Sequence, residues 1–207
     1  MHWIAKYLTN LKTLELYEPF GRFWYRKNTD PVSKLPSVTH FNIILSETAG
    51  QMLVEELSFD MPHLTKFSLN GVETDDRIIN FIKHFKELEI VELSVKDLNI
   101  AACIKKFQHI KQFTANITET VYGSRLQLIS LKQAFKHIDQ KSKLQTLKFV
   151  YCAESLLYKA VEAEMENINN HLREFSKRTW TLSQEKQIGT RQKYLILKRD
   201  PYTCESC

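Results

Sequence analysis

The chain has 207 residues, a formal net charge of +5, and 43% hydrophobic against 26% charged residues. This is the composition of a globular protein and not of a disordered or fibrous one. It has five glycines, of which the closest two, Gly50 and Gly71, lie 21 residues apart. Glycine-rich phosphate-binding turns and the GxSxG nucleophile elbow need neighbouring glycines, because other residues adopt those backbone conformations only with strain. The composition therefore argues against the common nucleotide-dependent enzymes and the α/β-hydrolases.

Neither a membrane span nor a metal site is expected. The sequence has no apolar run of about 18 residues, the length that a membrane span needs, and its start resembles no secretory signal. The four cysteines are then expected to be reduced thiols. Cys204 and Cys207 form half of a zinc-type CxxC pair without a second half. We therefore expect no metal, no cofactor and no catalytic centre, in a cytoplasmic or nuclear protein.

In chain order, the first regular feature is a spacing of apolar residues that recurs. It begins as Leu11-x-x-Leu14-x-Leu16 and returns at steps of 22 to 34 residues. The further copies are Val38/Phe41/Ile43, Leu64/Phe67/Leu69, Leu88/Val91/Leu93, Ile110/Phe113/Ala115, Leu144/Leu147/Phe149 and a degenerate seventh at Trp180 and Leu182. Another apolar residue stands three positions before several copies, at Leu8, Leu35, Met61, Phe85 and Phe107. The alternating second half of each copy predicts a short strand with one buried face.

Between the copies, the apolar residues follow a helical period. Such runs extend over 78–85, 100–107, 128–138 and 157–175. Asp75, Asp76 and Asp97 precede two of them, as residues at helix N-termini should. Strand and helix in alternation predict parallel strands joined by helical crossovers, stacked into a solenoid. A doubly wound sheet is the alternative, but its central strands would be continuously apolar instead of alternating.

At these residues the chain resembles a leucine-rich repeat protein. Six copies match the three apolar positions of the family phrase LxxLxLxx(N/C), and Cys152 matches its final position after Leu144, Leu147 and Phe149. Long units of irregular length with a cysteine variant are similar to the ribonuclease-inhibitor-like subclass behind F-box modules in ubiquitin ligase receptors. The resemblance implies an α/β solenoid of about six to seven repeats, with a concave parallel sheet and helices on the convex face.

The resemblance also implies how the chain is divided. We expect leucine-rich repeats over 1–174, then a degenerate last repeat, a capping hairpin and a flexible tail over 175–207, all in one structural domain. Residues 178–182 and 194–197 are the strand-like halves of that hairpin. Lys193, Lys198 and Arg199 would discourage further strand pairing at the sheet edge.

In such a fold, the residues that flank the buried pair of each strand line the open face of the sheet. They are mostly polar and uncharged, and Glu15 and Glu92 balance Lys66 and Lys148. A neutral face with scattered large side chains is typical of protein contacts and disfavours nucleic acid, which needs clustered cations. Strand propensity alone would also account for the large residues. The candidate partner-binding residues are Tyr17, His40, Asn42, Ile44, Lys66, Ser68, Asn70, Ile90, Glu92, Gln112, Thr114 and Lys148.

A second candidate patch lies within residues 20–27, where aromatic and basic residues are interleaved. Its members are Phe23, Trp24, Tyr25 and Arg26. They would either cover the first repeat as a packed cap or stack on single-stranded bases. The patch and the basic hairpin are the basis of an alternative function, a nucleic-acid-associated repeat protein.

Together these features predict a non-enzymatic protein-interaction module. The resemblance implies that it recognises substrates for a ubiquitin ligase complex. The expected partner is therefore a protein substrate or scaffold partner, and a ligase adaptor only if an F-box precedes Met1.

Overall fold

The computed structural model describes residues 9–18, 33–45, 59–74, 76–95, 103, 106–107, 109–117, 143–152, 162–163, 166, 170, 180–186 and 192–199. The chain forms two compact units, Met1–Ser94 and Val95–Cys207. The fold is of the α/β type, with mostly parallel strands. Within the described ranges, no helix is long and apolar enough to cross a membrane. The expected boundary at residue 174 lies outside the described residues.

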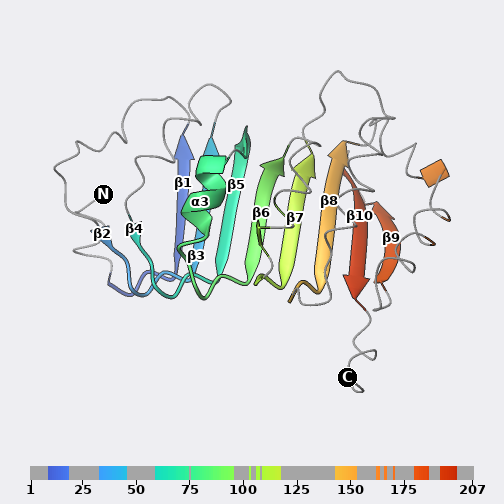
Figure 1. Ribbon diagram of the computed structural model, residues 1–207. Coiled ribbons are helices and arrows are strands. Elements are labelled where there is room, and N and C mark those ends of the chain that lie inside the picture. The colour runs from blue at the N-terminus through green and yellow to red at the C-terminus, as the bar shows by residue number, and fades with distance from the viewer. Residues whose placement is uncertain are drawn as a thin grey trace, which may run out of the picture. The chain divides into compact units, whose positions relative to one another are not determined.

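Four parallel strands form the sheet of the first unit (Figure 1). In spatial order they are β1 (Thr13–Glu18), β3 (His40–Leu45), β5 (Lys66–Glu73) and β6 (Ile90–Val95). Their pairing aligns two buried rows, Leu14/Phe41/Phe67/Val91 and Leu16/Ile43/Leu69/Leu93. These are the last two apolar positions of each copy, so the spacing read from the sequence predicts both the strands and their register. A short parallel pair, β2 (Ser33–Lys34) with β4 (Phe59–Asp60), lies apart from this sheet.

The entries into β3, β5 and β6 are built alike. The residue three positions before each copy opens a turn, since Val38 N donates to Leu35 O and Leu64 N to Met61 O, both at 3.2 Å. A single carbonyl then accepts two consecutive N–H groups of the next strand. Thr39 O does so from Thr65 N at 2.9 Å and Lys66 N at 3.0 Å. Lys12 O and Thr65 O act in the same way one strand earlier and one strand later. The sequence copies therefore correspond to one repeated hydrogen-bonded junction.

Helix α3 (Asp76–Ile82) packs on the buried side of this sheet. Asp76 lies in its first turn, as the sequence predicts, and favours the helix N-terminus electrostatically. The Phe81 ring lies 6.0 Å from that of Phe67, which in turn lies 5.8 Å from that of Phe41. The predicted helical run continues to Phe85, whereas the helix ends at Ile82. His84 N and Phe85 N bond carbonyls three residues back, so the last turn tightens and leads into the next junction.

Strand β5 contains a bulge at Gly71. Its register with β6 shifts between Leu69 and Glu73, and Gly71 has φ +88°. Gly71 N donates to Ser94 Oγ at 3.3 Å, and beyond the bulge Thr74 N and Thr74 Oγ1 both donate to Ser94 O, at 2.9 and 2.7 Å. These bonds keep β5 attached to β6 across the irregularity. Gly71 therefore lies inside a strand and supplies the left-handed conformation that the bulge requires.

In the second unit, three described strands run in one direction and a fourth opposes them. The strands are, in spatial order, β7 (Gln112–Ile117), β8 (Thr146–Cys152), β10 (Gln192–Arg199) and β9 (Trp180–Lys186). β7 and β8 are parallel, whereas β10 is antiparallel to both of its neighbours. The predicted hairpin is thus present as β9 and β10. Its second strand pairs with β8, so the degenerate seventh copy in β9 does not follow the sixth as a repeat would.

Helical residues of the second unit fall within two of the predicted runs. Cys103 and Lys106 are helical and belong to the run over 100–107. Glu162, Ala163, Glu166 and Asn170 are helical and exposed, within the run over 157–175. Their exposure fits an amphipathic helix, since all four lie outside the apolar stripe of that run. The run over 128–138 lies outside the described residues.

Candidate functional site

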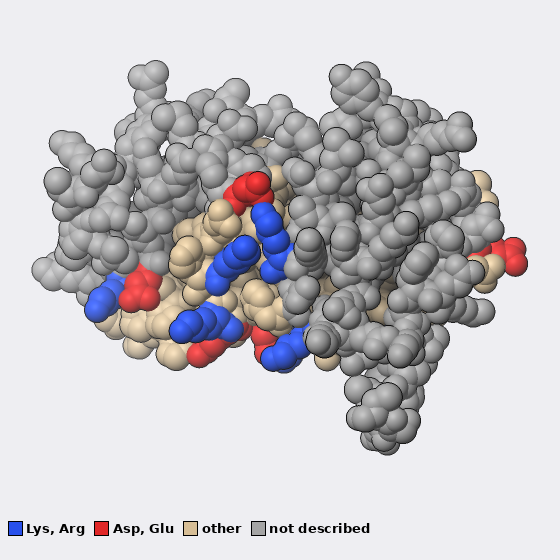
Figure 2. All heavy atoms as spheres, in the orientation of Figure 1, with Lys and Arg blue, Asp and Glu red and all other residues tan. Residues whose placement is uncertain are grey.

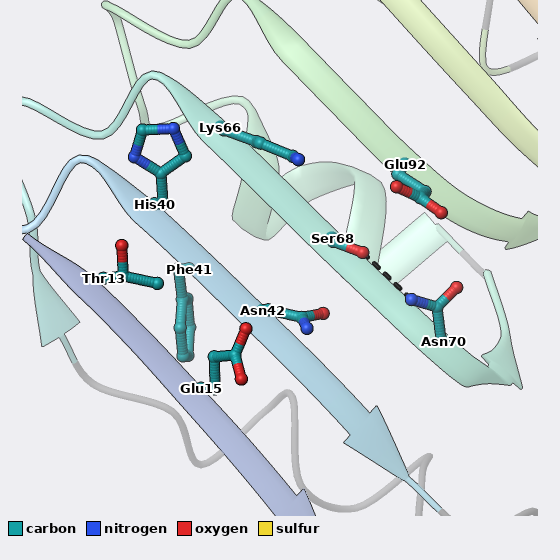
Figure 3. A pocket seen from close by; sticks show the side chains of 9 residues that line it. All are labelled: Thr13, Glu15, His40, Phe41, Asn42, Lys66, Ser68, Asn70 and Glu92. Atoms are coloured by element: carbon teal, nitrogen blue, oxygen red, sulfur yellow. Dashed lines mark hydrogen bonds between the residues drawn. The ribbon is translucent and has the colours of Figure 1, made fainter.

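Side chains on the first unit's strands that alternate with the buried rows emerge on the side of the sheet away from α3 (Figure 3). We call this surface the polar face. Strand pairing arranges it in three rows, Thr13/His40/Lys66/Ile90, then Glu15/Asn42/Ser68/Glu92, then Tyr17/Ile44/Asn70. Every residue of the first unit that the sequence nominates for partner binding belongs to one of these rows. The period-two alternation is what brings them to one surface.

A pocket of about 270 Å³ hollows the polar face. Its lining residues are Thr13, Glu15, His40, Phe41, Asn42, Lys66, Ser68, Asn70 and Glu92. Six of them are among the predicted binding residues. Thr13 and Glu15 are additional. They alternate with the buried residues of β1, as the predicted residues do in their own strands, and this alternation is the sequence signal that identifies them. Phe41 also lines the pocket, although its side chain belongs to a buried row.

Hydrogen bonds hold several groups of the polar face in place. Asn70 Nδ2 donates to Ser68 Oγ at 3.0 Å, the bond drawn in Figure 3. Tyr17 Oη donates to Glu15 Oε2, also at 3.0 Å. In contrast, the buried atom Asn42 Oδ1 has no hydrogen-bond partner among the described residues. An acceptor left in this state destabilises the protein by about 1–3 kcal/mol.

The side chain of His40 is oriented by the residue before it. His40 Nδ1 lies 2.9 Å from Thr39 Oγ1, and the same hydroxyl lies 3.3 Å from Lys12 O. The junction that starts β3 therefore holds the His40 ring through its Nδ1 atom. The other nitrogen, Nε2, is left as the group that can interact with a ligand.

The Tyr17 hydroxyl has a raised pKa. Its hydrogen bond to Glu15 is the main cause, and the negative charge of that carboxylate adds to it by disfavouring the phenolate. We expect Glu15→Gln to bring the pKa of Tyr17 down towards its ordinary value of 10.0. A pH titration of ¹³C-labelled tyrosine by NMR measures this change, with Glu89→Gln as a control that leaves the pair intact. An unchanged pKa in Glu15→Gln would show that the two side chains do not interact in solution.

The remaining predicted residues belong to the second unit or lie outside the described residues. Gln112, Thr114 and Lys148 belong to β7 and β8 of the second unit, where Thr114 and Lys148 are paired neighbours and Thr114 is buried. The Lys148 ammonium lies 3.9 Å from the centre of the Tyr194 ring. This cation–π contact holds the charge against the protein. Phe23, Trp24, Tyr25 and Arg26 lie outside the described residues, so the second candidate patch stays a prediction.

On the surface seen in Figure 2, the charged side chains of the described residues do not form patches of one sign. On the side that carries α3, basic and acidic side chains are interspersed. On the surface of the first unit, a hydrogen bond of 3.1 Å joins His63 Nδ1 and Glu87 Oε2. In the hairpin, the Arg199 guanidinium lies 5.0 Å from the Trp180 ring. These arrangements engage charged side chains in contacts within the protein.

Metal-binding groups do not cluster in the part of the chain that the structure describes. No group of three His, Cys, Asp or Glu side chains lies close enough there to hold an ion. Cys103 is a buried free thiol, and the CxxC pair lies outside the described residues. The polar face itself offers hydrogen-bonding and charged side chains.

Two comparisons with known proteins bear on this chain. No model of a protein family matches it, and no curated protein matches it either.

Proposed function

We propose that the chain is a leucine-rich-repeat interaction module whose polar face binds a partner protein. Support comes from the repeated junction, in which a turn leads to a carbonyl that accepts two N–H groups of the next strand. A stack of repeats needs such a unit at every step. Helix α3 lies on the opposite side of the sheet from the polar face. This agrees with a solenoid, in which crossover helices cover one side of the sheet and the other side is the binding surface.

The pocket on the polar face is the observation that carries this proposal. It is lined by two carboxylates, two basic side chains and neutral polar groups. Tyr17, beside it in the third row, is 56% exposed. An exposed tyrosine at the edge of a hollowed polar surface is a favourable anchor, because it offers a large contact area and a hydroxyl with little conformational entropy to lose.

The test places a bulky charge on the polar face. In Ile44→Arg, the new side chain would occupy the third row without entering the buried rows. The matched control is Asn80→Arg, which adds the same charge to an exposed position of α3. Quantitative affinity capture should identify proteins retained by the natural chain and by Asn80→Arg but lost by Ile44→Arg. If the two variants are equally folded by circular dichroism and retain the same proteins, the polar face is not the binding surface.

The resemblance to F-box receptors extends the proposal to substrate recognition for a ubiquitin ligase. We expect the protein, tagged at its genomic locus, to co-purify with cullin-type ligase subunits. A partner lost in Ile44→Arg should then also lose ligase-dependent ubiquitin conjugates in that variant. A face-dependent partner captured without ligase subunits would overturn the ligase part and leave an interaction module.

A further inference from the structure

Charges on the polar face are separated into two rows. The first row has His40 and Lys66 on the adjacent strands β3 and β5. The second row has Glu15 on β1 and Glu92 on β6, with Asn42 and Ser68 between them. The rows are two residues apart along each strand, which is about 6.6 Å. The pocket therefore has a basic end and an acidic end at a defined separation.

At the basic end, two side chains can receive a negatively charged group. The Lys66 ammonium makes no hydrogen bond or ion pair with any described residue. His40 has its Nδ1 bonded to Thr39, and Nε2 is left for a ligand. Adjacent strands lie about 4.8 Å apart, so one carboxylate can contact both side chains. This end is suited to an acidic group.

At the acidic end, the groups that line the pocket are acceptors. Glu15 contributes a carboxylate with one oxygen bonded to Tyr17, and Glu92 contributes a second carboxylate. A guanidinium has five N–H donors in a planar fork that matches the geometry of a carboxylate. An ammonium is a point charge and matches a carboxylate less well. This end is suited to arginine.

We propose that the pocket binds an extended segment of the partner protein that carries arginine and an acidic residue two positions apart. Alternate side chains of an extended segment leave the same face about 6.6 Å apart, which matches the separation of the two rows. The acidic side chain contacts His40 and Lys66, while the arginine contacts Glu15. This inference rests on the proposed function, because it names what the polar face recognises in its partner.

The experiment uses the ¹⁵N-labelled full chain and four capped heptapeptides. The test peptide is Thr-Thr-Arg-Thr-Asp-Thr-Thr, in which threonine favours the extended state. The others place Arg and Asp side by side, replace Asp with Arg, or replace the pair with Gln and Asn. We expect the test peptide to bind at least about tenfold more tightly than the others, as two charge-assisted hydrogen bonds allow. The shifted amide signals should include those of residues 13–15, 40–42 and 66–68.

A charge-reversed variant separates recognition from folding. Lys66→Glu should reverse the preference, so that the peptide with two arginines binds more tightly than the one with Arg and Asp. Lys83→Glu makes the same change at an exposed position off the polar face and should keep the original preference. A reversal of preference cannot result from misfolding, because a misfolded chain would lose all binding. Equal affinities for the four peptides, or an unchanged preference in Lys66→Glu, would overturn the proposal.

Failure of this inference differs from failure of the proposed function. If a partner is lost in Ile44→Arg but the peptides bind alike, the polar face binds protein by other contacts. If the test peptide binds the pocket but Ile44→Arg loses no partner, the pocket recognises the charge pair and the face is not a protein-binding surface. A mixture of free arginine and free aspartate shows whether the two charges must be linked. Binding of the mixture as tight as that of the peptide would contradict an extended segment as the ligand.

Discussion

Phe67→Ala is expected to lower the free energy of unfolding by about 3–5 kcal/mol, the range found for a buried phenylalanine. Phe67 is fully buried in β5, and its ring makes edge contacts with Phe41 at 5.8 Å and Phe81 at 6.0 Å. These contacts join a neighbouring strand and α3 to the same side chain. Backbone pairing with β3 and β6 prevents the strand from collapsing into the cavity that alanine would leave. Urea-induced unfolding followed by circular dichroism measures the loss.

Lys66→Ala is the matched control for this prediction. Lys66 is the preceding residue of β5, and its side chain lies on the polar face. Its truncation should change the free energy of unfolding by no more than about 0.5 kcal/mol. If Phe67→Ala and Lys66→Ala had similar small effects, β5 would not present alternate residues to a packed core and a polar surface.

Gly71→Ala is expected to lower the free energy of unfolding by more than about 2 kcal/mol. Gly71 has φ +88°, and a Cβ built on it would overlap the carbonyl oxygen of Leu45. The opposing atom belongs to the backbone of β3, so no side-chain movement can relieve the overlap. Alanine would force the bulge of β5 away from β3, and the bond from Gly71 N to Ser94 Oγ would be strained with it. Urea-induced unfolding again provides the measurement.

Gly71→Asn separates the two causes of this effect. Asparagine adopts the left-handed backbone conformation more readily than alanine, but it carries the same Cβ. Since the overlap with Leu45 O is the larger problem, we expect Gly71→Asn to destabilise nearly as much as Gly71→Ala. A well-folded Gly71→Asn variant beside an unstable Gly71→Ala variant would mean that the backbone conformation matters and the close approach does not.

Local patterns were sufficient to predict the strands of the six apolar copies and which of their residues face the core, but not the short pair β2 and β4. Phe41 and Phe67 hold the same place in their copies, and the structure pairs them directly. The reason is that a strand with one buried face has only one register that keeps its apolar residues inside. The same reasoning put His40 beside Lys66 and Asn42 beside Ser68. The acidic pair Asp75 and Asp76 likewise marked the start of α3.

Features that depend on contacts distant in sequence could not be predicted in this way. The alternating residues of Trp180 and Leu182 indicated a strand, but nothing local indicated that β10 would lie between it and β8. The unpartnered Asn42 Oδ1 and the bond between Tyr17 and Glu15 depend on side-chain geometry that spacing does not determine. Nothing local indicated that Gly71 would lie in a bulge within β5, where its N–H donates to Ser94 Oγ, 23 residues further on.

Hydroxyl-radical footprinting of the chain with and without its captured partner tests the polar face most directly. Tyrosine and histidine side chains report on their own exposure, and Tyr17 and His40 are exposed on the polar face. His63 and His84 are exposed at positions outside its three rows and serve as internal controls. We predict that the partner protects Tyr17 and His40 and leaves His63 and His84 unchanged. Protection confined to His63 and His84, with Tyr17 and His40 still reactive, would contradict the polar face as the binding surface.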